Sequence, residues 1–94
     1  MVMAIFEYDV ALEKQAEYIR MTQEEIKPLW ESLGCKSYDV WQPTGGGTGF
    51  VKSMLFEDMA GMKQIMANQA AEPAKKIFGR FAENVSRKVC EKRT

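Results

Sequence analysis

The side chains that could do chemistry in this 94-residue chain are aromatic, sulfur-containing and carboxylic. Histidine is absent, which excludes a Ser-His-Asp triad, a Cys-His pair and a histidine-bound zinc or haem. Tyr8, Trp30, Tyr38 and Trp41 each combine a flat apolar body with a polar atom. Such residues line pockets for flat ligands, because they stack on the ligand and make one directed hydrogen bond. The same residues could instead fill the core or a seam between two subunits.

Met54 and Met66 are candidate pocket residues of a second kind. Their flexible thioether side chains can line an adaptable apolar pocket, but they also pack well inside a core. Asp39 is the candidate general base, because burial of a carboxylate raises its pKa and lets it accept a proton near neutrality. At a solvated strand edge, Asp39 would be an ordinary surface charge.

The charged residues are balanced, with 13 Lys and Arg against 13 Asp and Glu. A net charge of zero, with both signs interspersed, argues against electrostatic binding of nucleic acid. Lys52 and Arg80 could neutralise a carboxylate or phenolate ligand, although the simpler expectation for both is a surface charge.

Cys35 and Cys90 lie far apart in the sequence and have no CxxC or metal-ligand spacing, so we expect two unpaired thiols. The early apolar run from Val2 to Phe6 ends at Glu7, which makes it too short for a signal peptide or a membrane span. We therefore expect a cytoplasmic protein that uses no membrane, metal or cofactor.

Hydrophobic periodicity predicts the element order β-α-β-β-α-β. Composition rich in β-branched and aromatic residues marks most of the predicted strands, at residues 2–10, 35–42, 50–56 and 86–92. Helical spacing of apolar residues covers the two regions between them, from Leu12 to Leu33 and from Asp58 to about Asn84.

Punctuating residues refine these elements. Pro28 predicts a kink or break near Thr22, and Gly34 predicts the end of the first helical region. The glycine-rich stretch 43–49 lies between two strands and lacks the Walker pattern. It is therefore predicted to be a mobile hairpin loop and not a phosphate site.

This order is the ferredoxin-like α+β arrangement, in which residues 1–94 form one domain with both helical regions on one face of a four-stranded antiparallel sheet. The other face should be polar in a monomer. It carries Met3 and Ile5 from the first strand, with Val51 and Leu55 from the third. A second copy packed sheet to sheet would cover these side chains, so we expect a homodimer.

Nearly the whole chain resembles the dimeric α+β barrel superfamily, and within it the antibiotic biosynthesis monooxygenase-like domains. The segment GCKSYDVW at residues 34–41 and the helix MKQIMANQAAEPAKKIFGRF at residues 62–81, broken at Pro73, carry this resemblance. It implies a cavity between sheet and helices in each subunit that holds a small hydrophobic or aromatic molecule. Some members of the family oxidise polyketide-type phenols without metal or flavin, and others degrade haem.

The chain departs from the active members at two places. It lacks the helix histidine that haem-degrading relatives use for iron, and its first strand offers Glu7, Tyr8 and Asp9 where active members often carry asparagine. Asn68 lies in the part of the long helix where relatives often place polar or histidine residues. The resemblance therefore implies Asn68 as a second catalytic candidate.

Two classes of function follow. The first is a cofactor-free, monooxygenase-like or cyclase-like enzyme that acts on a hydrophobic aromatic or polyketide-type compound. In this enzyme Tyr8, Tyr38, Trp41 and Asn68 would be wall or hydrogen-bond residues, and Asp39 would take a phenolic proton. The second is a non-catalytic metabolite-binding or structural homodimer. An open cavity with a buried carboxylate favours the first class, and a cavity filled by side chains favours the second.

Overall fold

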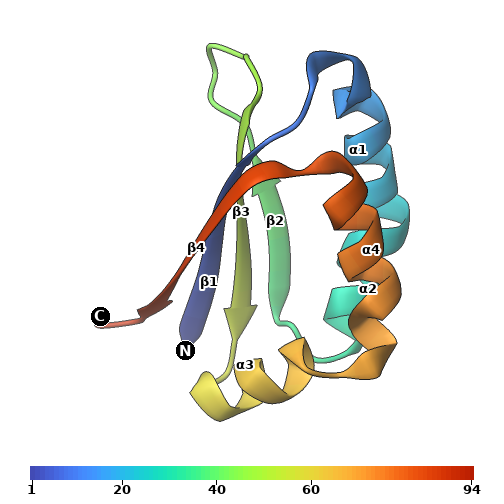
Figure 1. Cartoon of the computed structure of the whole chain (residues 1–94). Coiled ribbons are helices and arrows are strands. Elements are labelled where there is room, and N and C mark those ends of the chain that lie inside the picture. The colour runs from blue at the N-terminus through green and yellow to red at the C-terminus, as the bar shows by residue number, and fades with distance from the viewer.

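The computed structural model describes all 94 residues and consists of one antiparallel sheet with helices on one face (Figure 1). The strands are β1 (Val2–Asp9), β2 (Ser37–Trp41), β3 (Gly49–Phe56) and β4 (Glu83–Glu91), in the order β2-β3-β1-β4. The helices are α1 (Gln15–Met21), α2 (Lys27–Ser32), α3 (Met59–Met66) and α4 (Glu72–Phe81). The predicted ferredoxin-like α+β fold is confirmed.

The helices differ in how they meet the sheet. Helices α1, α2 and α4 stand along its face, whereas α3 lies beyond the end of β3 (Figure 1). Short 3-10 turns at Leu12–Lys14 and Gln69–Ala71 precede α1 and α4. None of the helices has the length and apolar character that crossing a bilayer requires. Cys35 and Cys90 are both free thiols, as expected.

The predicted irregularity in the first helical region is a π-helical segment, Thr22–Ile26, which joins α1 directly to α2. Pro28 lies in the first turn of α2 and has no N–H to donate. In a regular helix its ring would also collide with the carbonyl four residues earlier. The wider π-helical turn avoids this collision, so the helix continues past Pro28. Of the two predicted alternatives, a kink or a break, the chain therefore does not show the break.

Alternation along the strands decides which side chains are buried. The face of β1 and β3 under the helices includes Ala4, Tyr8, Phe50 and Phe56, all nearly inaccessible to water. The opposite face, named here the outer face, consists of partly buried or exposed residues on all four strands. Its apolar members are Met3, Ile5, Trp41, Val51 and Leu55.

The boundary between α4 and β4 comes earlier than predicted. The helix ends at Phe81, and Ala82 is already extended, with φ −88° and ψ 135°. Pairing with β1 then begins at Glu83, because hydrogen bonds to a neighbouring strand satisfy the backbone better than a frayed last helical turn. Val85 consequently lies on β4, where it is 48% exposed.

Gly34 generates the first prediction. Its φ is +115°, which strains any L residue, and an added Cβ would lie 3.0 Å from Ile65 Cδ1. We expect Gly34→Ala to lower the free energy of unfolding by about 1–3 kcal/mol. Gly45→Ala is the matched control, since nothing lies within 4 Å of its added Cβ. Urea denaturation followed by tryptophan fluorescence measures both, and equal losses would show that the Gly34 conformation is not required.

Candidate functional site

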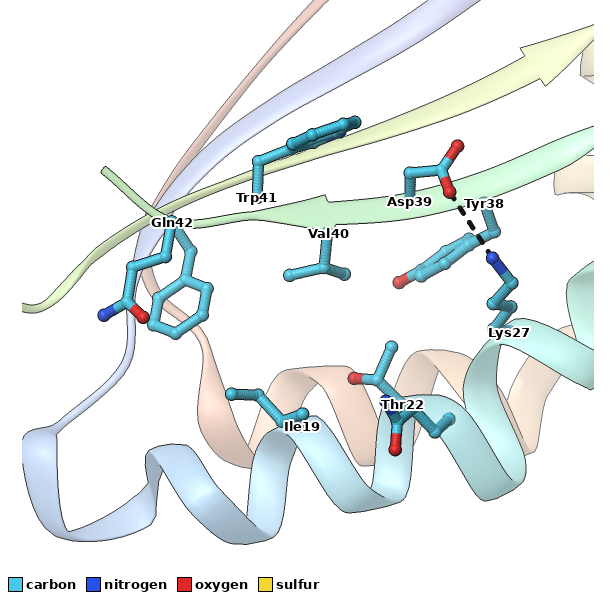
Figure 2. A pocket seen from close by; sticks show the side chains of 10 residues that line it. Ile19, Thr22, Lys27, Tyr38, Asp39, Val40, Trp41 and Gln42 are labelled. Carbon is cyan, nitrogen blue, oxygen red and sulfur yellow. Dashed lines mark hydrogen bonds and ion pairs between the residues drawn. The ribbon is translucent and has the colours of Figure 1, made fainter. Parts of the chain in front are cut away.

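Two cavities border the helical face of the sheet. The first, the edge cavity, has a volume of about 280 Å³ and lies between the first helical region and β2 (Figure 2). Its lining residues are Ile19, Thr22, Gln23, Lys27, Tyr38, Asp39, Val40, Trp41, Gln42 and Phe50. The second, the lysine cavity, has a volume of about 330 Å³. It is lined by Phe6, Trp30, Lys52, Met54, Met66, Ala74, Lys75, Phe78 and Arg87.

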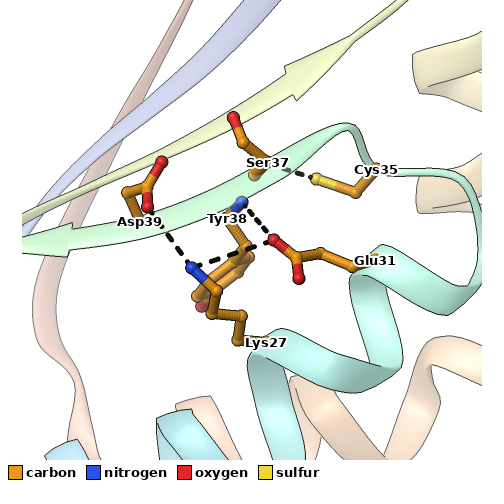
Figure 3. A network of polar contacts seen from close by, with 6 residues as sticks. All are labelled: Lys27, Glu31, Cys35, Ser37, Tyr38 and Asp39. Carbon is orange, nitrogen blue, oxygen red and sulfur yellow. Dashed lines mark hydrogen bonds and ion pairs between the residues drawn. The ribbon is translucent and has the colours of Figure 1, made fainter.

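An ion-pair network fixes the wall of the edge cavity (Figure 3). Lys27 Nζ lies 3.4 Å from Asp39 Oδ1 and 3.8 Å from Glu31 Oε2. Glu31 also accepts a hydrogen bond from the Tyr38 backbone N–H at 3.1 Å. The network therefore ties α2 to β2 and holds Tyr38 in place between the two layers.

Asp39 does not have the covered environment that a general base would need. It belongs to an edge strand, its side chain is 42% exposed, and its partner Lys27 is 40% exposed. A solvated carboxylate beside an ammonium group is an ordinary surface ion pair. The catalytic role of Asp39 stays a prediction that this geometry does not favour.

Lys52 is the unusual residue of the lysine cavity. On β3 it occupies every-other-residue positions together with Phe50 and Met54, so its side chain lies on the same face as theirs. That face is covered by the helices, and Lys52 is only 4% exposed. The expected surface charge at this position is therefore wrong. Burial of a lysine is costly unless the charge is compensated, and none of the ion pairs in the chain includes Lys52.

The contacts of Lys52 are a hydroxyl and aromatic faces. Its Nζ donates a hydrogen bond to Tyr38 Oη at 3.2 Å. The same nitrogen lies 3.5 Å from the ring centroid of Phe78 and 4.4 Å from that of Phe6. These groups stabilise an ammonium ion in part, because each presents negative potential to it.

Burial lowers the pKa of Lys52 to about 7, because a low-dielectric environment disfavours the ammonium ion. Near neutral pH, Lys52 is therefore an ammonium ion in some molecules and a free amine in the others. Burial raises the pKa of Tyr38 well above its ordinary value, so its phenol stays protonated. The amine of Lys52 can accept a proton, and the hydrogen bond to the phenol oxygen of Tyr38 positions this amine.

The structure divides the predicted ligand-binding residues between the two cavities. Tyr38 and Trp41 line the edge cavity with Asp39, whereas Trp30, Met54 and Met66 line the lysine cavity. Tyr38 also reaches the lysine cavity through its hydroxyl contact with Lys52. The cavities are thus neighbours that share one tyrosine.

Two predicted residues line neither cavity. Tyr8 is buried, its hydroxyl bonds to that of Tyr18, and its ring packs against Phe78 at a centroid distance of 4.9 Å. Asn68 is exposed and accepts a hydrogen bond from the Ala70 N–H at 2.9 Å, which caps the turn before α4. In this chain Tyr8 supports the cavity wall through Phe78, and Asn68 caps a turn.

The sequence suggested Lys52 as a cation for a carboxylate or phenolate ligand but placed it on the surface, and it did not indicate Phe6 or Phe78 as members of the same site. The signal for Lys52 was present, since Val51 and Leu55 were assigned to the face away from the helices and position 52 alternates with them. The contact with Phe78 had no such signal, because it joins β3 to a helix that follows much later in the chain.

The geometry defines a small α+β domain with a cavity between one face of its sheet and its helices. A family model described as antibiotic biosynthesis monooxygenase matches residues 1–76. The chain therefore belongs to the antibiotic biosynthesis monooxygenase family. No curated protein is significantly similar to it in sequence.

Solved structures share this fold at low sequence identity. HapK from Hahella chejuensis has a TM-score of 0.85 and 16% identity, over 98% of this chain and 92% of its own. A variant of SnoaB, a cofactor-independent oxygenase from Streptomyces nogalater, has a TM-score of 0.84 and 11% identity, over 99% and 93% of the two chains. At identities this low, the structural similarity establishes the common fold alone.

The buried amine generates a prediction on stability and pH. The folded chain releases the Lys52 proton near pH 7, whereas the unfolded chain keeps it up to the ordinary lysine value of 10.5. Unfolding therefore takes up a proton between these limits, and this group makes the free energy of unfolding increase by about 1.4 kcal/mol per pH unit.

Urea denaturation at several values from about pH 7 to about pH 8, below the range in which Cys35 and the tyrosines titrate, measures this slope. We expect Lys52→Met to remove the increase and Lys76→Met, at an exposed position, to keep it. Identical slopes in the wild type and Lys52→Met would mean that the buried amine has an ordinary pKa.

Proposed function

We propose that this chain is a cofactor-independent enzyme, monooxygenase-like or cyclase-like, that acts on a hydrophobic aromatic or polyketide-type compound in the lysine cavity. The observation that carries the proposal is the buried amine of Lys52, which faces an apolar cavity and pairs with no carboxylate. Membership of the antibiotic biosynthesis monooxygenase family supports it, as does the fold shared with SnoaB, itself a cofactor-independent oxygenase.

The cavity suits a flat molecule with one acidic hydroxyl group. Trp30, Met54 and Phe78 supply apolar walls, and no acidic side chain lines the cavity to repel an anion. The free amine of Lys52 takes the proton of a phenol, and the ammonium ion then lies beside the phenolate. In a low-dielectric site the attraction between the two ions is strong, and this attraction offsets the cost of removing both charges from water.

Lys52 thereby has the role that sequence analysis proposed for Asp39. The hydrogen bond to Tyr38 aims the amine, and burial keeps the phenolate away from water. An ionised phenol ring is electron-rich, so it can react with dioxygen in an oxygenation or with an electrophilic carbon of the same molecule in a cyclisation. In the oxygenation the substrate supplies all four electrons that reduce dioxygen, so one oxygen atom enters the ring as a quinone oxygen and the other leaves as water.

Ionisation of a bound phenol tests this function. We expect 2-naphthol to bind near pH 7 with the absorption spectrum of naphtholate, because Lys52 accepts its proton. Lys52→Met should weaken binding about tenfold or more and abolish the naphtholate band, since a charge-assisted contact is lost. Lys76→Met is the control and should behave as the wild type. Binding of neutral naphthol alone would favour a non-catalytic metabolite-binding protein.

We further propose that the chain forms a homodimer through the outer face of its sheet. Ile5, Val51 and Leu55 are only partly buried there, and Trp41 is 63% exposed. A second copy in a two-fold arrangement would cover this apolar surface with the same surface of the partner. A cytoplasmic location, expected from the sequence, stays a prediction.

One substitution on the outer face tests the oligomeric state. Ile5→Asp should convert the dimer to a monomer, because a carboxylate would be buried against apolar side chains. Ala60→Asp, at an exposed position on α3, is the control and should remain dimeric. Light scattering after size-exclusion chromatography at micromolar concentration measures the mass. A dimer that survives Ile5→Asp would rule out sheet-to-sheet packing at this residue.

A further inference from the structure

The amine of Lys52 is a nucleophile as well as a base. Three elements hold its Nζ: β2 through the hydroxyl of Tyr38, α4 through the ring of Phe78, and β1 through the ring of Phe6. Lysines that form Schiff bases in enzymes have this environment, because a hydrophobic pocket keeps part of the amine unprotonated near neutral pH.

The charged and titratable groups around Lys52 favour the free amine. Lys75 of α4 and Arg87 of β4 also line the cavity, and both are cationic. Cys35, before β2, has a pKa raised to about 11 by burial, so its thiol is neutral. Tyr38 is likewise neutral, and the residues from β1, α2 and α3 are apolar. No anion on any of these elements faces Lys52 to stabilise the ammonium ion.

We propose that the lysine cavity captures aromatic aldehydes and ketones as an imine on Nζ of Lys52. The nitrogen lone pair attacks the carbonyl carbon, and a proton moves from nitrogen to oxygen to give a carbinolamine. The C–O bond then breaks, the remaining nitrogen proton leaves with the hydroxyl group, and one water is released. No electrons are gained or lost overall, so no co-reactant is needed.

The shape of the cavity selects the class of carbonyl compound. Trp30, Phe6 and Phe78 supply aromatic walls, and Met54 and Met66 add adaptable apolar surface. A volume of about 330 Å³ accommodates a bicyclic aromatic ring. The carbonyl group of such a molecule is its most polar part, so it will be directed to the amine and to the hydroxyl of Tyr38.

Reductive trapping tests the imine. The wild-type protein is incubated with 2-naphthaldehyde near neutral pH, the imine is reduced with sodium cyanoborohydride, and peptide mass spectrometry locates the naphthylmethyl adduct. We expect Lys52 to be labelled about tenfold or more faster than exposed Lys76 in the same molecule, because burial keeps part of the Lys52 amine unprotonated near neutral pH. Equal labelling of the two lysines would overturn the proposal.

Two variants separate a reactive site from a merely buried one. Lys52→Arg keeps the charge but has no reactive amine, so the fast adduct should vanish while labelling of Lys76 continues. Tyr38→Phe removes the hydrogen bond that aims Nζ and should slow labelling at Lys52 only. Labelling at Lys52 should level off just above neutral pH, whereas labelling of an ordinary exposed lysine amine keeps increasing. Parallel pH profiles would contradict a cavity-tuned amine.

This inference does not rest on the proposed oxygenase-like or cyclase-like function. Trapping at Lys52 without ionisation of bound naphthol would support carbonyl chemistry and reject the phenol mechanism. Ionisation of naphthol without trapping would do the reverse. Excess 2-naphthol should also slow labelling at Lys52 but not at Lys76, because both compounds are proposed to occupy the lysine cavity. Unchanged labelling at Lys52 would show that 2-naphthol binds elsewhere and would count against the phenol mechanism.

Discussion

The buried amine of Lys52 has no carboxylate partner, and the neighbouring side chains are those that can tolerate it. The neutral phenol of Tyr38 accepts a hydrogen bond from the amine, and the negative faces of the Phe6 and Phe78 rings attract the ammonium ion. The remaining cost of burial is offset by the surrounding apolar core, in which residues such as Phe56 and Met54 are fully covered. Chemical reactivity at Lys52 is thus a consequence of packing.

The position of that amine depends on contacts far from it in the sequence. Tyr38 is fixed at its backbone N–H by Glu31 of α2 and at its hydroxyl by Lys52 of β3. Phe78 is fixed by its edge-to-face contact with Tyr8. The ion pairs in the edge cavity therefore serve the lysine cavity, because they hold the edge strand β2 against α2 and so keep Tyr38 aimed at the amine.

Patterns of residue type predicted the fold but not the centre of the site. Residue composition placed all four strands to within a few residues, and Gly34 marked the end of the first helical region, because both signals are local. Lys52 was expected on the surface because lysine is almost never fully buried, and residue type then outweighed the alternation along β3. Asp39 was judged by its chemistry and Asn68 by the family resemblance, whereas exposure and a turn hydrogen bond decide their environments.

The two faces of β3 join the proposed dimer to the proposed chemistry. Lys52 points to the helices, while its neighbours Val51 and Ser53 point to the outer face. A strand cannot shift by one residue without exchanging these two sets, so a partner packed on Val51 would also hold Lys52 in register. Covering the outer face would remove water from one side of β3 and stiffen it, which favours a precisely held amine over a mobile one. On this reasoning the second subunit contributes to the site without supplying a residue to it.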